Sequence, residues 1–336
     1  MSRRLRVGVF VALLVLVAAA TTVFALRDAE RYRDRHDAPP GVPVAGRAGL
    51  PDGPRILFRH TGTDSRFGLV AGVPLAEPGG ERVISDVACD RVDAVGGTVS
   101  CLHTLRGVVT RYELRELDAD LTEQHRVSLP GIPSRTRLSP DADLVATTTF
   151  VSGHSYMQTG FSTATEIRDV GGEGRGNLER FALILDGEEV RPADRNLWGV
   201  TFLDDRTFYA TAATGGRTYL VRGDLEARTL TGLRENAECP SLSPDGTRLA
   251  YKVDGPEAGT HWSFAVLDLA TGTETVLAGE AAGVDDQAAW LDEDTILYGL
   301  PRTEEPGVTD VWALDTTATA EPRLLIEQAW SPAVVR

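Results

Sequence analysis

Hydrophobic positions follow two different patterns along the 336-residue chain. Residues 7–26 form an unbroken apolar run without a charge, whereas from Arg55 onward apolar residues occur in short β-branched or aromatic runs between turns, with almost no helical periodicity. About 20 helical residues, each rising about 1.5 Å, are long enough to cross a bilayer core of about 30 Å. The pattern therefore predicts one N-terminal transmembrane helix over residues 7–26 and an all-β domain over residues 55–336.

Positive charge near the N-terminus indicates how the apolar run would be inserted. Arg3, Arg4 and Arg6 precede it, which favours a cytoplasmic segment over residues 1–6, although four arginines on the far side weaken this bias. A cleaved signal peptide is the alternative, but the run is longer than the roughly 7–15 apolar residues of a usual signal core. Under either interpretation the bulk of the chain is exported. We expect a single-pass protein of the cell membrane with its β domain on the extracytoplasmic side.

Residues 27–54 connect the apolar run to the β domain. The segment 27–37 mixes charges of both signs at spacings that suit a short solvated helix. Its four acidic residues make binding to anionic lipid the less favoured use. Residues 38–54 are rich in proline and glycine and are therefore predicted to form a stalk between anchor and domain.

A turn motif recurs through the β domain. Its clearest copy is Ser243-Pro244-Asp245-Gly246, in which proline fixes φ, the aspartate side chain bonds the backbone two residues on, and glycine accepts a positive φ. Each copy follows a large apolar residue, and the related segments are 138–146, 202–210, 290–298 and a truncated copy at 330–332. The copies are 64, 40, 48 and 40 residues apart. Apart from the first, these intervals bracket the roughly 40–50 residues of a four-stranded propeller blade.

A second repeated feature is a strand, a tight turn and another apolar run. It predicts one such strand for each of six blades, at residues 68–71, 112–118, 181–186, 219–224, 264–269 and 311–315. The chain ends supply the missing pieces, because residues 328–335 form an inner strand without successors and residues 55–60 form a second strand without an inner strand before it. Joining them completes a blade and leaves no unpaired sheet edge there. The sequence thus predicts a six-bladed β-propeller closed by both chain ends.

The segment Ser243–Tyr251 (SPDGTRLAY), followed by FAVLDLATGTETVL, resembles the WD40-like (PD40) repeat of the TolB-type six-bladed propellers. The similarity covers about residues 55–336, and several repeats in phase make it more specific than one. TolB carries an α/β domain ahead of its propeller, whereas a membrane segment and a stalk take that place here. The resemblance implies an extracytoplasmic scaffold for protein contacts, linked to envelope or translocation processes, outside the Tol–Pal system itself.

The 64-residue interval contains the longest departure from the repeat, Ser152–Arg180. Insertions on propeller loops commonly form a binding face, so we predict a binding loop here. Its donors, aromatic surface and charge would come from His154, Ser155, Tyr156, Phe161 and Arg168. The alternative is a long connection between the second and third strands that packs over the ring.

Motifs for catalysis, metals and cofactors are sparse. The GHSY segment at 153–156 is not a GxSxG elbow, and the glycine-rich residues 171–176 lack the strand and helix of a phosphate loop. Acid pairs at 204/205, 285/286 and 292/294 adjoin turns, where aspartate serves local bonding, so calcium binding is a minor alternative. The histidines have no metal-ligand spacing. We therefore predict no catalytic residue, no metal site and no cofactor.

The three cysteines fit an exported protein. Cys89 and Cys101 flank a turn at residues 95–97 and are expected on neighbouring strands of one hairpin. An oxidising compartment allows them to form a disulfide if the strand register lets the sulfurs meet. Cys239 lies on the inner strand of a different blade and is expected to be a buried free thiol.

Charge narrows the choice of partners. The formal net charge is −15, and residues 1–37 carry seven arginines against four acids, so the remainder is more acidic still. Such a surface repels phosphate backbones, which argues against nucleic acid as a partner. We predict a monomeric, non-enzymatic scaffold that binds an unidentified protein and is held to the cytoplasmic membrane by residues 7–26. The alternative is a ligand-sensing or enzymatic propeller, of the lyase, cyclotransferase or dehydrogenase type, with its site at the mouth of the central channel.

Overall fold

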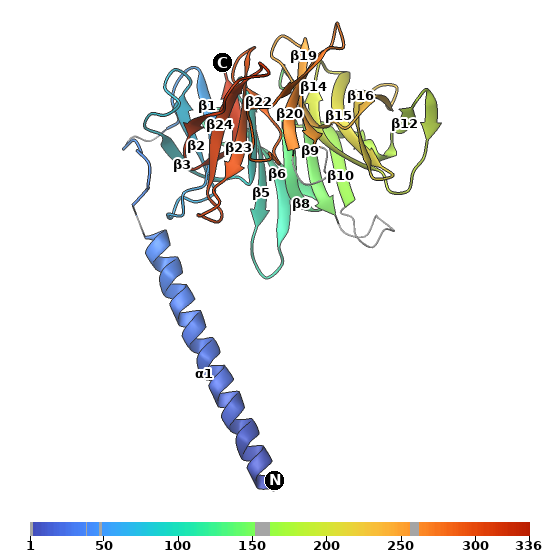
Figure 1. The fold of residues 1–336 in the computed structure, drawn as a ribbon. Coiled ribbons are helices and arrows are strands. Elements are labelled where there is room, and N and C mark those ends of the chain that lie inside the picture. The colour runs from blue at the N-terminus through green and yellow to red at the C-terminus, as the bar shows by residue number, and fades with distance from the viewer. Residues whose placement is uncertain (1–2, 38, 47–48, 152–161, 256–261) are drawn as a thin grey trace.

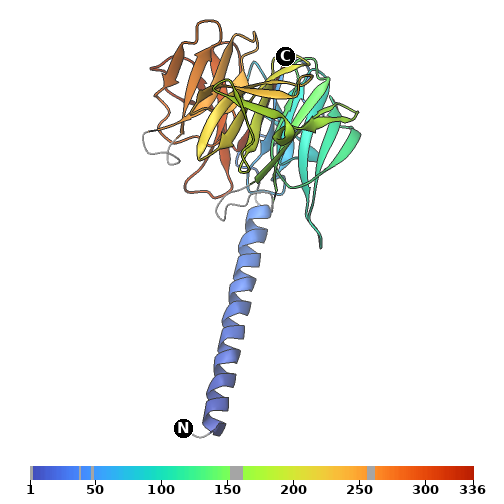
Figure 2. The same ribbon diagram turned by 90° about the vertical axis from the view of Figure 1, so that its right-hand side faces the viewer.

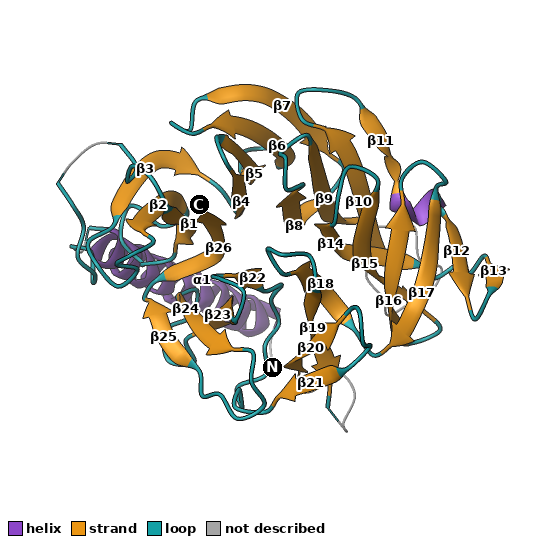
Figure 3. Cartoon of the chain, turned by 90° about the horizontal axis from the view of Figure 1, so that it is seen from above, coloured by secondary structure: helices purple, strands orange, loops and turns teal. Residues whose placement is uncertain are grey.

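The computed structural model describes residues 3–37, 39–46, 49–151, 162–255 and 262–336. One long helix, α1 (Arg3–His36), precedes a β domain arranged as six blades around a central axis (Figures 1 and 3). The predicted six-bladed propeller is confirmed.

Each blade is built on four antiparallel strands, of which the first lies nearest the axis. In spatial order from the axis outward, the first three blades are β26 (Ala329–Val335), β1 (Arg55–His60), β2 (Leu69–Pro74), β3 (Val83–Ala88); β4 (Arg91–Val95), β5 (Thr98–Leu105), β6 (Arg111–Asp118), β7 (Glu123–Leu129); and β8 (Ile132–Leu138), β9 (Leu144–Val151), β10 (Ser162–Asp169), β11 (Gly174–Asn177). The fourth has six strands: β14 (Asn196–Phe202), β15 (Thr207–Thr214), β16 (Arg217–Asp224), β17 (Thr229–Glu235), β12 (Ala182–Leu185), β13 (Glu188–Val190). The last two are β18 (Glu238–Leu242), β19 (Arg248–Asp254), β20 (Trp262–Asp268), β21 (Glu274–Leu277); and β22 (Ala289–Trp290), β23 (Thr295–Pro301), β24 (Thr309–Asp315), β25 (Arg323–Ile326).

The two chain ends close the ring as the sequence predicts. Strand β26 pairs antiparallel with β1, from Arg55 opposite Val335 to His60 opposite Ala329. This arrangement supplies β1 with an inner neighbour that the N-terminal half of the chain does not provide.

Local chemistry explains the recurring turn between the first and second strands. The Ser243 hydroxyl donates to Oδ1 of Asp245 (2.6 Å) and accepts from the backbone N–H of Arg248 (2.9 Å). Gly246 has a φ of +72°, which the absence of a Cβ permits. Bonds from Ser243 and Thr247 stabilise the carboxylate and lower the pKa of Asp245 to about 2. The turn is therefore held by its own four residues and their immediate neighbours.

One predicted strand has a different place in the fold. Residues 162–169 are β10, the third strand of their blade, and residues 174–177 are its fourth, so these residues are not part of the insertion expected over residues 152–180. The segment 181–186, predicted to be a third strand, contains β12, which pairs parallel with β17 and extends the next blade outward. The sequence of β10, STATEIRD, has Ile167 as its one large apolar residue, whereas the other third strands carry several. Strands β12 and β13 thus account for part of the extra length of the 64-residue interval.

Apolar side chains fill the space between neighbouring blades. In one cluster, Leu144 and Ile167 of the third blade pack with Leu197, Phe208 and Val221 of the fourth, and all five are at most 2% exposed. Such sheet-on-sheet packing requires alternating inward positions on each strand, which is the pattern seen in the sequence. The core is therefore a ring of interfaces between blades.

Helix α1 joins the predicted apolar run and the charged segment 27–36 without a break. Residues 8–30 are long and apolar enough to cross a membrane, and the described part of this window is not buried against the propeller. The following segment lies on the closing blade: Val44 forms a β-bridge with Arg82, and Val42 is 7% exposed. Figures 1 and 2 show α1 projecting from the side of the propeller on which the β5–β6 hairpin extends.

Candidate functional site

The central channel is the cavity that a propeller offers for binding, and its wall is made by the six inner strands (Figure 3). One end carries the recurring turns. The other end carries the connections between second and third strands and the beginnings of the inner strands. The side chains at the two ends of the channel differ in kind from those in its middle.

Buried ion pairs occupy the middle of the channel. Nη1 of Arg91 on β4 contacts Oδ1 of Asp286 at 3.0 Å, and Nη1 of Arg137 on β8 lies 3.6 Å from Oδ1 of Asp93. Burial and the nearby Arg135 lower the pKa of Arg91 to about 10, while Asp286 opposes the shift. The free space among these groups is only about 20 Å³, room for about one water molecule. The side chains thus bind one another and leave little space for a ligand.

The only lysine of the chain, Lys252, lies on β19. Its Nζ contacts Oδ1 of Asp285 at 2.7 Å and lies 4.7 Å from the ring centre of Trp262. Cys239, at the start of β18, is a buried free thiol, as predicted. Asp285 and Asp286 therefore act as partners of Lys252 and Arg91. This is a structural role for an acid pair at which calcium binding was the minor alternative.

One mouth of the channel lies among the recurring turns. A cavity of about 600 Å³ is bounded there by side chains of both charges and by apolar surface, including Asp93, Arg137, Asp245, Trp290 and Arg336. Nε1 of Trp290 donates to the carbonyl of Ser241 (3.0 Å), which fixes the indole. This mouth has the size of a small-molecule or peptide site and is open to solvent.

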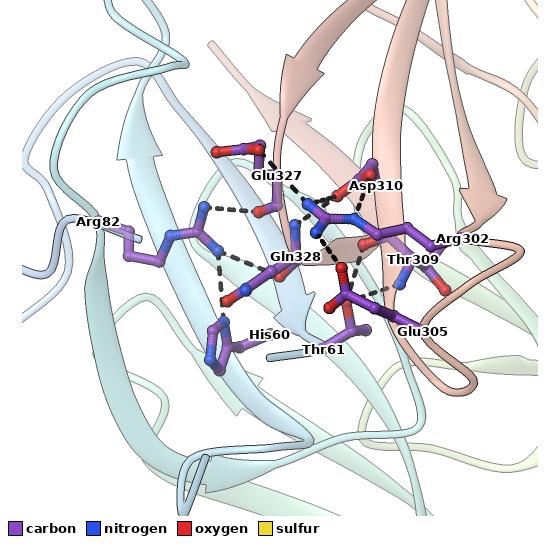
Figure 4. A network of polar contacts seen from close by, with 9 residues as sticks. All are labelled: His60, Thr61, Arg82, Arg302, Glu305, Thr309, Asp310, Glu327 and Gln328. Carbon is purple, nitrogen blue, oxygen red and sulfur yellow. Dashed lines mark hydrogen bonds and ion pairs between the residues drawn. The ribbon is translucent and has the colours of Figure 1, made fainter. Parts of the chain in front are cut away.

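Polar contacts join the last blade to the closing blade at the other end of the channel (Figure 4). Arg302 donates from Nε and Nη2 to the two carboxylate oxygens of Asp310 (2.7 and 2.9 Å), and the backbone N–H of Gln328 donates to Oδ1 of the same carboxylate (2.8 Å). The Thr61 hydroxyl donates to the carbonyl of Thr309 (2.8 Å) and accepts from its N–H (3.1 Å). We call the nine residues of Figure 4 the closing network: His60, Thr61, Arg82, Arg302, Glu305, Thr309, Asp310, Glu327 and Gln328.

Arg82 ties the segment after α1 to this network. Its guanidinium donates from Nη1 to the carbonyl of Gln328 (3.1 Å) and from Nη2 to that of Glu327 (2.6 Å). Its backbone N–H donates to the carbonyl of Pro43 (3.2 Å) and its carbonyl accepts from the N–H of Ala45 (2.8 Å). One residue therefore contacts both the segment leading from the helix and the segment leading into β26.

His60 and Asp64 form a buried pair that resembles part of a catalytic triad. Arginine has no acceptor, so Nδ1 of His60 accepts from Nη1 of Arg82 (3.3 Å), and Nε2 donates to Oδ2 of Asp64 (3.2 Å). Burial lowers the pKa of His60, the bond to Asp64 opposes this, and Arg82 adds to the lowering. Both ring nitrogens are occupied, so the imidazole holds the fold and is not available as a general base.

The predicted binding loop can be placed only in part. His154, Ser155, Tyr156 and Phe161 lie outside the described residues. Arg168 lies near the far end of β10, where Nη2 donates to the carbonyl of Gly172 (2.9 Å). Six residues of strand, about 20 Å, separate it from the beginning of β10. Arg168 is therefore not part of the loop to which the sequence assigned it, because the intervening residues form a strand.

Sequence reasoning did not single out the partly buried carboxyl group of Glu179. Oε1 accepts from the Thr163 hydroxyl (2.9 Å) and the Thr165 N–H (3.0 Å), beside a polar cavity of about 270 Å³. Burial raises the pKa of Glu179 to about 7, although these bonds oppose the shift. Its partners lie on β10, a strand that the sequence pattern did not reveal, so Glu179 could not have been singled out.

A disulfide joins Cys89, which precedes β4, to Cys101 on β5. Their Cα atoms are 5.4 Å apart. Cys89 lies in the connection between β3 of the closing blade and β4 of the next blade. The disulfide therefore ties this connection to β5 of the next blade.

Three carboxylates gather at exposed turns, with Asp141, Asp143 and Asp205 offering oxygens within 4.8 Å of one another. Oδ1 of Asp141 already accepts from the hydroxyl of Ser139 (2.5 Å) and from the N–H of Asp143 (3.2 Å). Such bonding is what the turn motif requires, so the cluster is explained by the turns.

Comparison with solved structures places the propeller among known folds. It is similar to TolB from Acinetobacter baumannii, with a TM-score of 0.60 and 15% identity over 85% of this chain and 68% of that chain. It is also similar to a chain of a nidogen/laminin complex, with a TM-score of 0.53 and 13% identity over 84% and 98%. A puromycin-hydrolysing peptidase from Mycobacterium tuberculosis gives a TM-score of 0.51 and 13% identity, and the matched region is 85% of this chain but 45% of that one. No protein-family model and no curated protein match the sequence.

Proposed function

We propose that this TolB-like six-bladed propeller is a membrane-anchored, extracytoplasmic scaffold that binds a protein partner and performs no chemistry of its own. The resemblance of its repeats to TolB makes envelope or translocation work the expected setting. The exposed apolar window of α1 supports an anchor in the cytoplasmic membrane. The disulfide between Cys89 and Cys101 supports an oxidising compartment outside the cytoplasm.

The observation that carries the proposal is the cavity of about 600 Å³ among the recurring turns. Gly41, in the segment after α1, lies beside Gln328 at one end of the channel. The cavity lies at the opposite end and therefore faces away from the anchor. Its wall alternates charged groups, such as Asp245 and Arg336, with the apolar surface of Trp290. A protruding peptide segment of a partner would find both hydrogen-bonding groups and an aromatic face there.

A ligand-sensing or enzymatic propeller is the alternative. The similarity to a peptidase propeller supports this alternative, although the match covers only 45% of the peptidase chain. Against it, the polar groups in the middle of the channel pair with one another, as Arg91 does with Asp286, and the free space there is small. Catalysis requires unpaired groups converging on a substrate-sized space.

Photo-crosslinking in the native host tests the scaffold proposal. A photoreactive residue replaces Pro244, which is exposed in the mouth, and in a matched control replaces Ala227, which is exposed on the same face outside it. We expect one specific protein adduct from position 244 and none from position 227, and size-exclusion chromatography with light scattering should give a monomer for the free chain. Equal labelling from both positions would contradict a partner site at the mouth. A ligand found by thermal shift together with no adduct would favour the alternative.

A further inference from the structure

The tip of the β5–β6 hairpin exposes two adjacent valines. Val108 is 107% exposed and Val109 is 73% exposed, the largest values among the exposed large hydrophobic residues of the described chain. Arg106 and Arg111 flank them and are also exposed. An apolar tip between two cations has no partner within the described propeller.

The tip stands clear of its own blade. Pairing of β5 with β4 ends at Leu102 opposite Arg91, whereas β5 and β6 continue to pair as far as Leu105 opposite Arg111. Three further residue pairs extend the hairpin by about 10 Å beyond the inner strand. Figures 1 and 2 both show this hairpin extending in the direction of α1.

Contacts of the chain after α1 place the anchor on the same face. A Cβ on Gly41 would lie 2.8 Å from Nε2 of Gln328, so the backbone passes closely over this side chain. Gln328 immediately precedes β26, at the end of the channel from which the β5–β6 hairpin also projects. Between residue 26 and the end of the helix at His36, ten helical residues span about 15 Å. The tip therefore lies on the side of the propeller from which α1 projects, and this spacer separates that side from the apolar window.

We propose that the tip of the β5–β6 hairpin inserts into the interfacial region of the bilayer that holds α1. Val108 and Val109 enter the boundary between head groups and acyl chains, and Arg106 and Arg111 contact lipid phosphates. Short apolar segments flanked by cations bind such interfaces by burying apolar area and by attraction to anionic lipid. Together with α1, the tip gives the propeller a second point of attachment and fixes its orientation. The inference rests on the membrane anchoring in the proposed function.

Fluorescence quenching of the full chain in nanodiscs tests the insertion. An environment-sensitive fluorophore is attached at Val108→Cys and, as a matched control, at Ala227→Cys on the opposite face. Cys239 is buried and the other two cysteines form a disulfide, so the parent chain should take up little label. Labelling of the parent chain measures the background. We expect spin-labelled lipid to quench the label at 108 about threefold more than the label at 227, and aqueous iodide to do the reverse. Nanodiscs without anionic lipid, or the variant Arg106→Glu/Arg111→Glu, should reduce quenching by lipid.

Other occupants give different results. A label at 108 that iodide quenches as fully as the label at 227 would overturn the inference, because the tip would then be in water. Shielding from both quenchers would also overturn it, in favour of a covering protein or a second copy. Flotation of the unlabelled chain with liposomes tests the anchor separately. A chain that floats but whose tip is in water contradicts the insertion and leaves the proposed membrane anchoring intact. Unchanged melting of Val108→Cys shows that the variant is folded.

Discussion

Replacing Asp310 by asparagine should weaken the closure of the ring. The Asp310 carboxylate is 9% exposed and accepts two bonds from Arg302 and one from the N–H of Gln328. Asparagine keeps one acceptor but removes the charge and presents an N–H group to the guanidinium. The backbone of Gln328, which leads into β26, loses part of its support.

The magnitude follows from the burial of the pair. Hydrogen bonds to charged groups contribute about 1.5–3 kcal/mol each, and breaking a buried pair costs about 3–5 kcal/mol. Arg302 is 25% exposed and keeps contacts with Glu305 (3.0 Å) and Glu327 (3.4 Å), so part of the loss is recovered. We therefore expect Asp310→Asn to lower the free energy of unfolding by about 2–3 kcal/mol and Tm by about 4–6 °C.

The control is another arginine–aspartate pair, at an exposed site. Arg206 donates from Nε (3.0 Å) and Nη2 (2.8 Å) to Asp224, and the two side chains are 56% and 32% exposed. Asp224→Asn should cost much less than Asp310→Asn, because water screens the exposed pair and solvates either side chain. The two variants therefore differ in burial and position while sharing the chemistry.

Urea denaturation and thermal melting of the full chain in detergent measure both changes. A double-mutant cycle with Arg302→Gln isolates the coupling to Asp310 from other effects of the substitution. If Asp310→Asn and Asp224→Asn lower stability equally, or the coupling is near zero, the closing network does not stabilise the ring as argued here.

Three further changes test other parts of the fold. Replacing Cys89 and Cys101 by serine should lower stability by about 3 kcal/mol, because the bond closes a short loop in the unfolded chain, and an unchanged urea midpoint would contradict this. The lowered pKa of His60 predicts stability that is present above its unfolded pKa of about 6.5 and falls as the pH drops below it; His60→Gln should flatten this dependence in melts between pH 5 and 8. The raised pKa of Glu179, about 7, has the opposite sign, so its contribution is present below about pH 4.5 and is lost as the pH rises through 7. Glu179→Gln should remove that loss, and identical pH profiles for variant and parent would refute the assignment.

The sequence was most informative where structure is determined locally. The turn at residues 243–246 is held by bonds among its own residues and their neighbours, so its copies mark the ends of inner strands where they occur. The closing strand was also predictable, because residues 328–335 and 55–60 each lack what the other supplies. Strand β10 was missed because serine and threonine occupy most of its inward positions, and such residues are equally typical of a loop.

The polar sites could not have been predicted because their members are far apart in sequence. Thr61 and Thr309 are separated by 248 residues, and Arg91 and Asp286 by 195. Nothing in the neighbourhood of either residue specifies its partner. Only the closed ring brings them together, so the same closure that the repeats predict creates contacts that the repeats do not encode.

The order of contacts along the chain determines how the anchor is joined to the propeller. Residues 41–45 meet Gln328 and Arg82 before the chain reaches Arg55, the first residue of β1. Arg82 in turn binds the carbonyls of Glu327 and Gln328, which lead into β26. A force on the anchor is therefore transmitted through Arg82 to the closing blade and to the segment before β26. It reaches these two parts before it reaches β1. The load is applied to the pairing of β1 with β26 at the end next to Gln328, and β1 is not peeled from Arg55, its partly buried first residue.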